Sequence, residues 1–389
     1  MLINQNSSRL YVVDALRGFA IISIMLIHNL EHFDYYFTPE GLPAWLKPID
    51  QGIWDTLFFL FGGKSYAIFA LLFGLTFFIQ NDNQSKKGKD FRPRFAWRLL
   101  LLLGFGLINS AFYQGDILTI YAIIGFVLIP VAKLSNKTVF IIAVLLMLQP
   151  YEWINVIRGL QQPDMEMANP ASWALFGKMD SYIQGNSIVD TWIGNLTNGK
   201  VAVLLWTWEA GRVFQTASLF MLGMLAGRKA LFVNSPENSK FWLKTLLVAI
   251  VAFVPLFIIK NNVMEWVSSV AIHRPLELIV RSWSNVAFMI VLVSGFTLLY
   301  RSRALHKTLD VLSPFGCMSM SNYIMQSIVG SFIYYGFGLG LYRYTGATYS
   351  ILIGVVLAIL QGIFSNYWMK NHRQGPLETI WHKLTWISL

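Results

Sequence analysis

The chain has almost no cysteine and little charge. A single cysteine, Cys317, stands among 389 residues, which excludes internal disulfides and metal sites built from cysteine. Charged residues make up only 13% of the chain, whereas hydrophobic residues make up 55% and aromatic residues 15%. Soluble domains carry about a quarter charged residues. The composition therefore excludes an ordinary soluble domain and predicts an integral membrane protein.

The charges that remain are unbalanced, with a formal net charge of +10. In a soluble chain this excess would suggest a nucleic-acid partner, but here the basic residues fall between hydrophobic runs. Such a placement is typical of the cytoplasmic loops of membrane proteins. We therefore expect the lipid bilayer as a partner and no nucleic acid. The polar residues 4–9 lead into a hydrophobic run without a cleavage site of the usual form, so no cleavable signal peptide is expected.

A helix that crosses a bilayer requires about 20 apolar residues. The sequence predicts ten such spans, near residues 12–30, 56–80, 96–113, 116–133, 138–150, 211–228, 242–260, 278–300, 316–340 and 350–369. Ten crossings place both termini on one side. Eighteen loop Lys and Arg residues then fall on the side of the termini and seven on the other side, so both termini are expected in the cytoplasm. We predict an all-α polytopic protein in which residues 1–389 form one multi-pass transmembrane domain, with 151–200 as an external loop or interfacial segment.

The first predicted span carries ionisable residues on one face. Each helical residue turns by about 100°, so Arg17 and His28 fall within about 20° of one another and roughly 16 Å apart along the axis. Asp14 and His32 fall on the same side. Ionisable groups at membrane depth are costly and usually line a functional interior. Alternatively, Asp14 and Arg17 only pair with each other at the cytoplasmic rim, which leaves His28 unexplained.

The predicted spans also bring ionisable residues of different helices to one depth. Counted at about 1.5 Å per residue from the cytoplasmic ends, His28 lies roughly 20 Å deep, and Lys64, Asp116 and Arg212 lie roughly 24–26 Å deep. Around one wet cavity these four residues can pair and keep their charges. Alternatively, Asp116 and Arg212 sit in the external headgroup region. Gly62-Gly63 predicts a break in the second span that lines such a cavity.

Asp14-x-x-Arg17-Gly18, with His28 eleven residues after Arg17, resembles the signature of transmembrane acyltransferases. That superfamily includes bacterial O-acetyltransferases and the lysosomal heparan glucosaminide N-acetyltransferase. Other motifs, in matching order from end to end, resemble the bacterial YeiB-like family, domain of unknown function 418: Gly63-Lys64-Ser65-Tyr66, Leu72-Phe73-Gly74, Gly115-Asp116-Ile117-Leu118, Met221-Leu222-Gly223-Met224, Ser321-Asn322-Tyr323 with Gln326, Tyr335-Gly336, Gly338-Leu339-Gly340-Leu341 and Gly375-Pro376-Leu377-Glu378 with Trp381. The YeiB-like pattern often has Asn where this chain has His28, so this position is more similar to the O-acetyltransferase branch.

Acyl transfer from a thioester to a hydroxyl or amine needs a general base and groups that stabilise the developing oxyanion. His28 is the candidate base, and Lys64 or Arg212 is the candidate for the oxyanion. Asp116 could orient His28 or raise its pKa. The resemblance implies a cytosolic acyl-CoA donor and an extracytoplasmic acceptor, such as a glycan or lipid.

Four further residues are candidates for donor binding. Arg17, with Asp14 beside it, stands at the cytoplasmic end of the same face as His28. Asn322 and Gln326 lie roughly 12–18 Å deep and could line the path of the pantetheine arm, although hydrogen bonding between helices is the commoner role of such residues. We expect no bound cofactor and no metal, with acyl-CoA as a co-substrate.

These observations favour a membrane acyltransferase that moves an acyl group, with acetyl as the first candidate. The resemblance implies the inner (plasma) membrane of a bacterium as its location. One alternative is a transporter or channel whose buried charges gate a solute, and another is a membrane scaffold without catalysis. Transfer of label from acetyl-CoA distinguishes an acyltransferase from a transporter, a channel or a scaffold.

Overall fold

The computed structural model describes residues 10–33, 39 and 41–387, and in these ranges the chain forms helices and no strand. The all-α prediction is therefore confirmed. In chain order the elements are α1 (Tyr11–Phe33), α2 (Lys47–Leu60), α3 (Ser65–Ser85), α4 (Arg92–Phe112), α5 (Leu118–Ile124), η1 (Gly125–Val127), α6 (Leu128–Val131), α7 (Asn136–Met147), α8 (Pro150–Gln161), α9 (Ala171–Phe176), α10 (Asp180–Ile183), α11 (Ile188–Gly194), η2 (Asn195–Gly199), α12 (Lys200–Glu209), α13 (Arg212–Arg228), α14 (Pro236–Trp266), α15 (Val270–Arg301), α16 (His306–Asp310), α17 (Ser313–Cys317), α18 (Ser319–Tyr334), η3 (Leu341–Arg343), α19 (Ala347–Asn371) and α20 (Pro376–Thr385).

Among the described residues, six helices are long and apolar enough to cross a membrane. They are α1, α4, α14, α15, α19 and the run formed by α2 with α3. A seventh candidate consists of α7 and α8, which meet at a bend of 41°. The ten crossings and the side on which the termini lie stay predictions. The other predicted spans correspond to shorter helices, among them α13 with 17 residues and α18 with 16.

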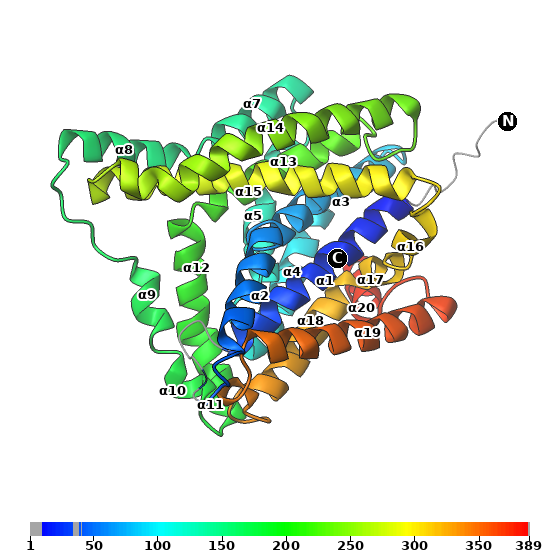
Figure 1. Ribbon diagram of the computed structural model, residues 1–389. Coiled ribbons are helices and arrows are strands. Elements are labelled where there is room, and N and C mark those ends of the chain that lie inside the picture. The colour runs from blue at the N-terminus through cyan, green and yellow to red at the C-terminus, as the bar shows by residue number, and fades with distance from the viewer. Residues whose placement is uncertain (1–9, 34–38, 40, 388–389) are drawn as a thin grey trace.

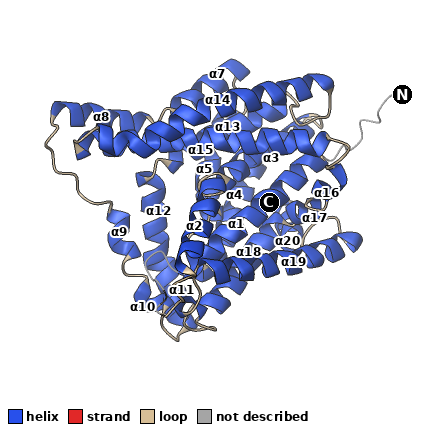
Figure 2. Cartoon of the chain, viewed as in Figure 1, coloured by secondary structure: helices blue, strands red, loops and turns tan. Residues whose placement is uncertain are grey.

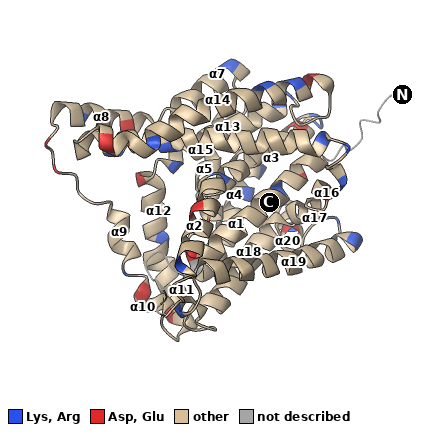
Figure 3. Cartoon of the chain, viewed as in Figure 1, with Lys and Arg blue, Asp and Glu red and all other residues tan. Residues whose placement is uncertain are grey.

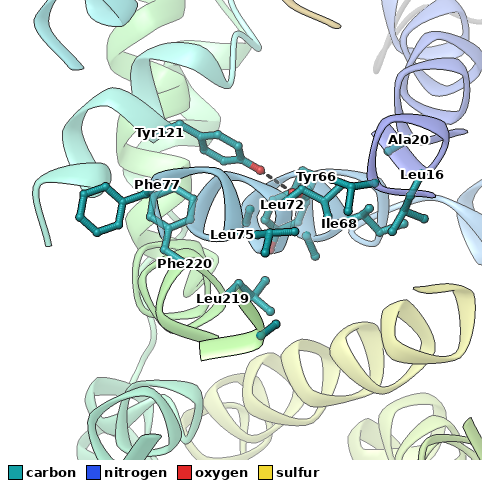
Figure 4. Packing of buried hydrophobic residues seen from close by; sticks show 14 of the residues in the cluster. Leu16, Ala20, Tyr66, Ile68, Leu72, Leu75, Phe77, Tyr121, Leu219 and Phe220 are labelled. Carbon is teal, nitrogen blue, oxygen red and sulfur yellow. Dashed lines mark hydrogen bonds between the residues drawn. The ribbon is translucent and has the colours of Figure 1, made fainter. Parts of the chain in front are cut away.

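Helix α3 lies at the centre of the molecule, in contact with α1, α13 and α15 (Figure 1). Its side chains Leu72 and Phe77 belong to one buried cluster with Leu16 of α1, Tyr121 of α5 and Phe220 of α13 (Figure 4). Burial of one such apolar side chain contributes about 1.5–3 kcal/mol to stability. The core of the fold is therefore apolar, and α3 connects α1 to α13.

Two glycines let the backbones of α3 and α13 touch. A Cβ atom placed on Gly74 would lie 1.8 Å from the carbonyl oxygen of Phe220, and one on Gly223 would lie 1.8 Å from that of Leu71. No larger residue fits either position without separating the helices, as at other small-residue crossings of membrane helices. Gly74 and Gly223 come from two of the motifs quoted above, which the fold thus brings face to face.

The long helices α14 and α15 pack side by side, and α19 lies across the molecule from them (Figures 1 and 2). Their outward faces are apolar: Val248 is 68% exposed, Val251 73% and Ile363 63%. Exposing so much apolar surface to water is unfavourable, whereas contact with lipid chains carries no such cost. The several apolar helices with such faces indicate a membrane protein.

Basic residues lie at the right-hand ends of α14 and α19 in Figure 3, and further blue segments lie toward the left-hand ends of α14 and α15. Lys240 and Lys244 lie in the first turns of α14, and Lys370 lies in the last turn of α19. The start of α1 is at this same end (Figure 1). This is the end that the excess of loop Lys and Arg residues predicts to be cytoplasmic.

The break predicted at Gly62-Gly63 is present, because α2 ends at Leu60 and α3 begins at Ser65. Gly63 has a φ of +74°, which a residue with a side chain rarely adopts. In the segment 151–200 the chain forms the short helices α8 to α11, and α11 then runs on through η2 into α12. These helices lie at the end of the molecule opposite the basic ends of α14 and α19 (Figure 1).

Candidate functional site

Two cavities lie one after the other along α1. The first, here called the Arg17 cavity, has a volume of about 480 Å³. The second, the His28 cavity, has a volume of about 400 Å³. Ile24, Ile117, Tyr121 and Tyr323 line both cavities and form the partition between them. The two ionisable residues predicted to share a face of α1 therefore open into two adjacent cavities rather than into one.

In the Arg17 cavity, the guanidinium group of Arg17 is fixed on two sides. Its Nη1 donates to Oδ1 of Asp14 over 3.0 Å, and its Nη2 donates to Oγ1 of Thr76 on α3. The Arg17 side chain keeps 20% of its surface exposed. The pairing of Asp14 with Arg17, which was the alternative prediction from the sequence, is thus present. Arg17 also lines a cavity.

The Arg17 cavity holds two further cations that sequence reasoning assigned only to topology. Arg98 of α4 is buried, lies 3.9 Å from the ring centre of Trp381 and donates to Oγ1 of Thr385 over 3.1 Å. Arg373 also lines the cavity. Arg98 lies at the start of the predicted span 96–113 and Arg373 follows the predicted span 350–369. The packing of α20 on α4 brings them to the same cavity as Arg17.

One wall of the Arg17 cavity is the contact between α20 and the start of α18. The carboxylate of Glu378 accepts hydrogen bonds from the backbone N–H of Met320 (2.7 Å), the backbone N–H of Ser321 (3.1 Å) and the Ser321 hydroxyl. Burial raises the pKa of Glu378, while the hydrogen bonds from Ser321 and Met320 act in the opposite direction. The contact joins two quoted motifs, the one that ends at Glu378 and the one that begins at Ser321.

In the His28 cavity, the His28 ring lies among tyrosines. Its centre is 4.6 Å from the ring centre of Tyr113 and 5.8 Å from that of Tyr323. The Tyr113 hydroxyl donates to Oε2 of Glu31 over 2.8 Å, and Glu31 lines the same cavity one helical turn beyond His28. Glu31 and Tyr113 are therefore candidate site residues that sequence reasoning did not select. The spacing of three residues between His28 and Glu31 was the available signal.

Arg212 links the His28 cavity to a third one. It lines the His28 cavity and also a cavity of about 580 Å³ that contains Lys64, here called the Lys64 cavity. Its guanidinium carbon lies 4.4 Å from the ring centre of Tyr66 and 4.0 Å from that of Trp206. Planar stacking of this kind holds an arginine in place without neutralising it. Arg212 thus lines one cavity together with His28 and another together with Lys64.

Asp116 is fully buried and lines none of the three cavities in the described part of the chain. Its Oδ1 accepts from Asn109 over 2.9 Å, and its Oδ2 accepts from the backbone N–H and the hydroxyl of Thr119, both over 2.8 Å. Lys200 of α12 lies 3.6 Å from Oδ2. The partners of Asp116 thus fix the turn before α5, and His28 is not among them.

Asn322 and Gln326 lie between α18 and α19. Nδ2 of Asn322 donates to the Ser365 hydroxyl over 3.0 Å, and Nε2 of Gln326 donates to Oε1 of Gln361 over 3.2 Å. Both residues are buried, and within the described ranges neither lines the three cavities named here. The structure therefore brings Asp14 and Arg17 together and places Asn322 and Gln326 in hydrogen bonds between helices.

No group of three or more His, Cys, Asp or Glu side chains within the described residues is placed to hold a metal ion. The side chain of His32 lies outside those residues. What the three cavities offer is a histidine beside tyrosines, several cations and apolar walls. Such a set can bind anionic groups and move a proton.

Fold and cavities define a helical membrane protein with charged internal cavities. Residues 226–388 match the family model described as "Protein of unknown function (DUF418)". The chain is similar to the uncharacterized protein YxaH of Bacillus subtilis, at 29% identity over 98% of this chain and 95% of that protein. It is also similar to the uncharacterized protein YeiB of Escherichia coli, at 26% identity over 96% of this chain and 95% of that protein. No solved structure matches the chain.

The predicted likeness to the YeiB-like family is therefore confirmed, by the family model over residues 226–388 and by similarity to YxaH and YeiB over nearly the full length of the chain. An uncharacterized 39.9 kDa protein of Bacillus acidopullulyticus is a further relative, at 22% identity over 97% of this chain and 94% of that protein. All three relatives are described as uncharacterized.

Proposed function

We propose that the chain transfers an acyl group, acetyl in the first instance, from a cytosolic acyl-CoA to an extracytoplasmic acceptor such as a cell-surface glycan or a lipid. The observation that carries this proposal is the arrangement along α1. Arg17 and His28 open into two adjacent cavities that share the partition of Ile24, Ile117, Tyr121 and Tyr323. A donor with a charged end and a long arm fits two cavities in line.

The donor end of the proposed reaction lies in the Arg17 cavity. Arg17, Arg98 and Arg373 line it, and arginines suit the phosphates of a nucleotide because each guanidinium offers paired donors. With ten crossings and both termini in the cytoplasm, this cavity faces the cytoplasm. The thioester arm then extends past Tyr121 and Tyr323 toward His28, over the roughly 16 Å of helix that separate Arg17 from His28.

The chemistry of the proposed reaction takes place in the His28 cavity. His28 takes the proton of the acceptor hydroxyl or amine while that oxygen or nitrogen attacks the thioester carbonyl carbon. Arg212, in the same cavity, stabilises the oxyanion that forms. The C–S bond then breaks, and CoA leaves as a thiolate that takes the proton from His28. Glu31 and Tyr113 line the part of the cavity around His28 and keep its ring in position. Asp116 acts as a positioning residue because it fixes the turn before α5.

A transporter is the second candidate, since the same two cavities in line describe a solute path with Tyr121 and Tyr323 as the constriction. The two functions differ in their products. Purified protein in lipid vesicles is incubated with radiolabelled acetyl-CoA, and label is followed in glycan, lipid and protein. Transfer of label supports the acyltransferase, whereas solute flux without any labelled product supports the transporter.

A further inference from the structure

The Lys64 cavity contains more positive than negative charge. Its charged lining residues are four cations and one carboxylate, Lys64, Arg212, Lys260, Arg281 and Asp55. Arg281 pairs with Glu277 over 3.5 Å. Among the described residues Lys64, Arg212 and Lys260 form no ion pair. Three cations from the α2–α3 break, α13 and α14 thus converge on one cavity, and none of the three forms an ion pair with Asp55, the carboxylate that also lines it.

Aromatic rings compensate these cations only in part. The Lys64 ammonium lies 5.8 Å from the ring centre of Phe288, and the Lys260 ammonium lies 5.1 Å from that of Phe257. Lys64 also donates to the carbonyl oxygen of Phe58 over 3.3 Å. Contacts of this kind contribute little compared with the cost of burying an unpaired cation such as Lys64, which is 8% exposed. The arrangement is therefore best completed by an anionic ligand.

The remaining lining residues narrow the kind of anion. Side chains with hydroxyl or amide groups, Ser282, Ser284, Asn285, Asn261 and Gln215, supply neutral hydrogen-bonding groups beside the cations. A phosphate monoester has three exposed oxygens and a phosphodiester has two, so either can accept from several lysines and amides at once. On the side of α14, Phe253 and Phe257 give the cavity an apolar wall.

We propose that the Lys64 cavity binds a phosphate group. We assign this cavity as the acceptor subsite, which means that the acceptor carries a phosphate. This assignment rests on the proposed acyl transfer. The link is Arg212, which with Tyr66 and Trp206 lines both this cavity and the His28 cavity. A phosphate held by Lys64 and Lys260 places the rest of the acceptor next to His28. The phosphate comes either from a lipid headgroup, with chains along the Phe253 wall, or from a soluble molecule.

The test measures binding, so it does not depend on catalysis. Purified protein in dodecyl maltoside micelles, whose detergent carries no phosphate, is titrated with two probes, short-chain phosphatidylglycerol and glycerol 3-phosphate. The double variant Lys64→Gln with Lys260→Gln is compared with Lys240→Gln with Lys244→Gln, which removes the same charge from exposed positions near the start of α14. Lys260→Gln alone serves if the double variant does not fold.

We expect one probe to bind, with affinity about tenfold lower for each cavity lysine removed and unchanged in the control variant. Preference for phosphatidylglycerol identifies a lipid source, and binding of glycerol 3-phosphate identifies a soluble one. Binding of neither probe, or equal weakening in both double variants, overturns the phosphate site. If phosphate binding survives but no acyl transfer is found, the site stands and only its assignment to an acceptor fails.

Discussion

The ammonium group of Lys200 lies 3.6 Å from Oδ2 of Asp116 and donates to the Asp116 carbonyl oxygen over 3.2 Å, with both side chains buried. The two residues stand 84 positions apart in the sequence. The pair joins α12 to the turn before α5, beside the His28 cavity. It therefore connects the segment predicted to be external with the helices of the core.

Asp116→Ala is expected to lower the free energy of unfolding by about 3–5 kcal/mol, because it leaves Lys200 buried without its partner. Lys200→Ala is expected to do the same, and the double variant should lose less than the two single variants together. Thermal unfolding in detergent measures all three, with the exposed Lys178→Ala as the control. Additive losses would mean that the two side chains do not act as a pair.

The topology prediction concerns which side of the membrane the cavities face. A reporter fused after Leu389 should read cytoplasmic, and a reporter inserted near Gln162 should read external, because loop Lys and Arg residues favour the cytoplasm. Gln162 directly follows α8 and is exposed, so an insertion there disturbs no buried contact. A cytoplasmic reading at Gln162 would mean that the crossings are miscounted and would remove the argument that His28, Lys64, Asp116 and Arg212 lie at one depth.

Arg17→Ala is expected to weaken donor binding by about 1.5–3 kcal/mol, through loss of a charge-assisted contact with phosphate. Arg17→Lys should recover only part of that affinity, because the paired donors are lost. Since Arg17 also bonds Asp14 and Thr76, folded yield is measured on the same preparations. Thr76→Val removes one of these contacts but leaves the charge, and it is the control. Reduced yield with unchanged donor affinity would leave Arg17 a purely structural residue.

Glu378 gives the contact between α18 and α20 a dependence on pH. Burial raises its pKa above the ordinary value of 4.5, so the folded protein holds this proton more tightly than the unfolded chain. The contribution of Glu378 to the free energy of unfolding is thus complete below pH 4.5 and decreases as the pH rises through the folded-state pKa. The melting temperature of wild type relative to Glu378→Gln should therefore fall as the pH rises above 4.5. A difference that does not change with pH would contradict this assignment.

Local patterns in the sequence predicted local features of the fold. The pair Gly62-Gly63 predicted the break between α2 and α3, and the helical turn of about 100° per residue predicted that Arg17 and His28 share a face of α1. Hydropathy did not distinguish helices that face lipid from helices such as α13, which is apolar because protein surrounds it. The count of long apolar helices is therefore six or seven among the described residues.

Local sequence patterns did not predict contacts between residues that are far apart in the sequence. Nothing local indicates that Lys200 faces Asp116, or that Arg98 stacks on Trp381. Depth counted along each helix placed Lys64, Asp116 and Arg212 in one layer, but depth does not fix direction around the helix axis. In the structure Arg212 lines two cavities, whereas Asp116 is buried and lines neither of them.

The most direct test of the account is acyl transfer by the purified protein and its loss in His28 variants. Wild type, His28→Ala and His28→Asn are incubated with radiolabelled acetyl-CoA and a cell-envelope extract, and donor binding is measured separately. His372→Ala, at an exposed position after α19, is the matched control. The account predicts a labelled acceptor with wild type and His372→Ala. It also predicts turnover about 10²–10⁴-fold lower in both His28 variants, with donor affinity nearly unchanged. Transfer at the wild-type rate by His28→Ala, or no labelled product with any of the proteins, would contradict it.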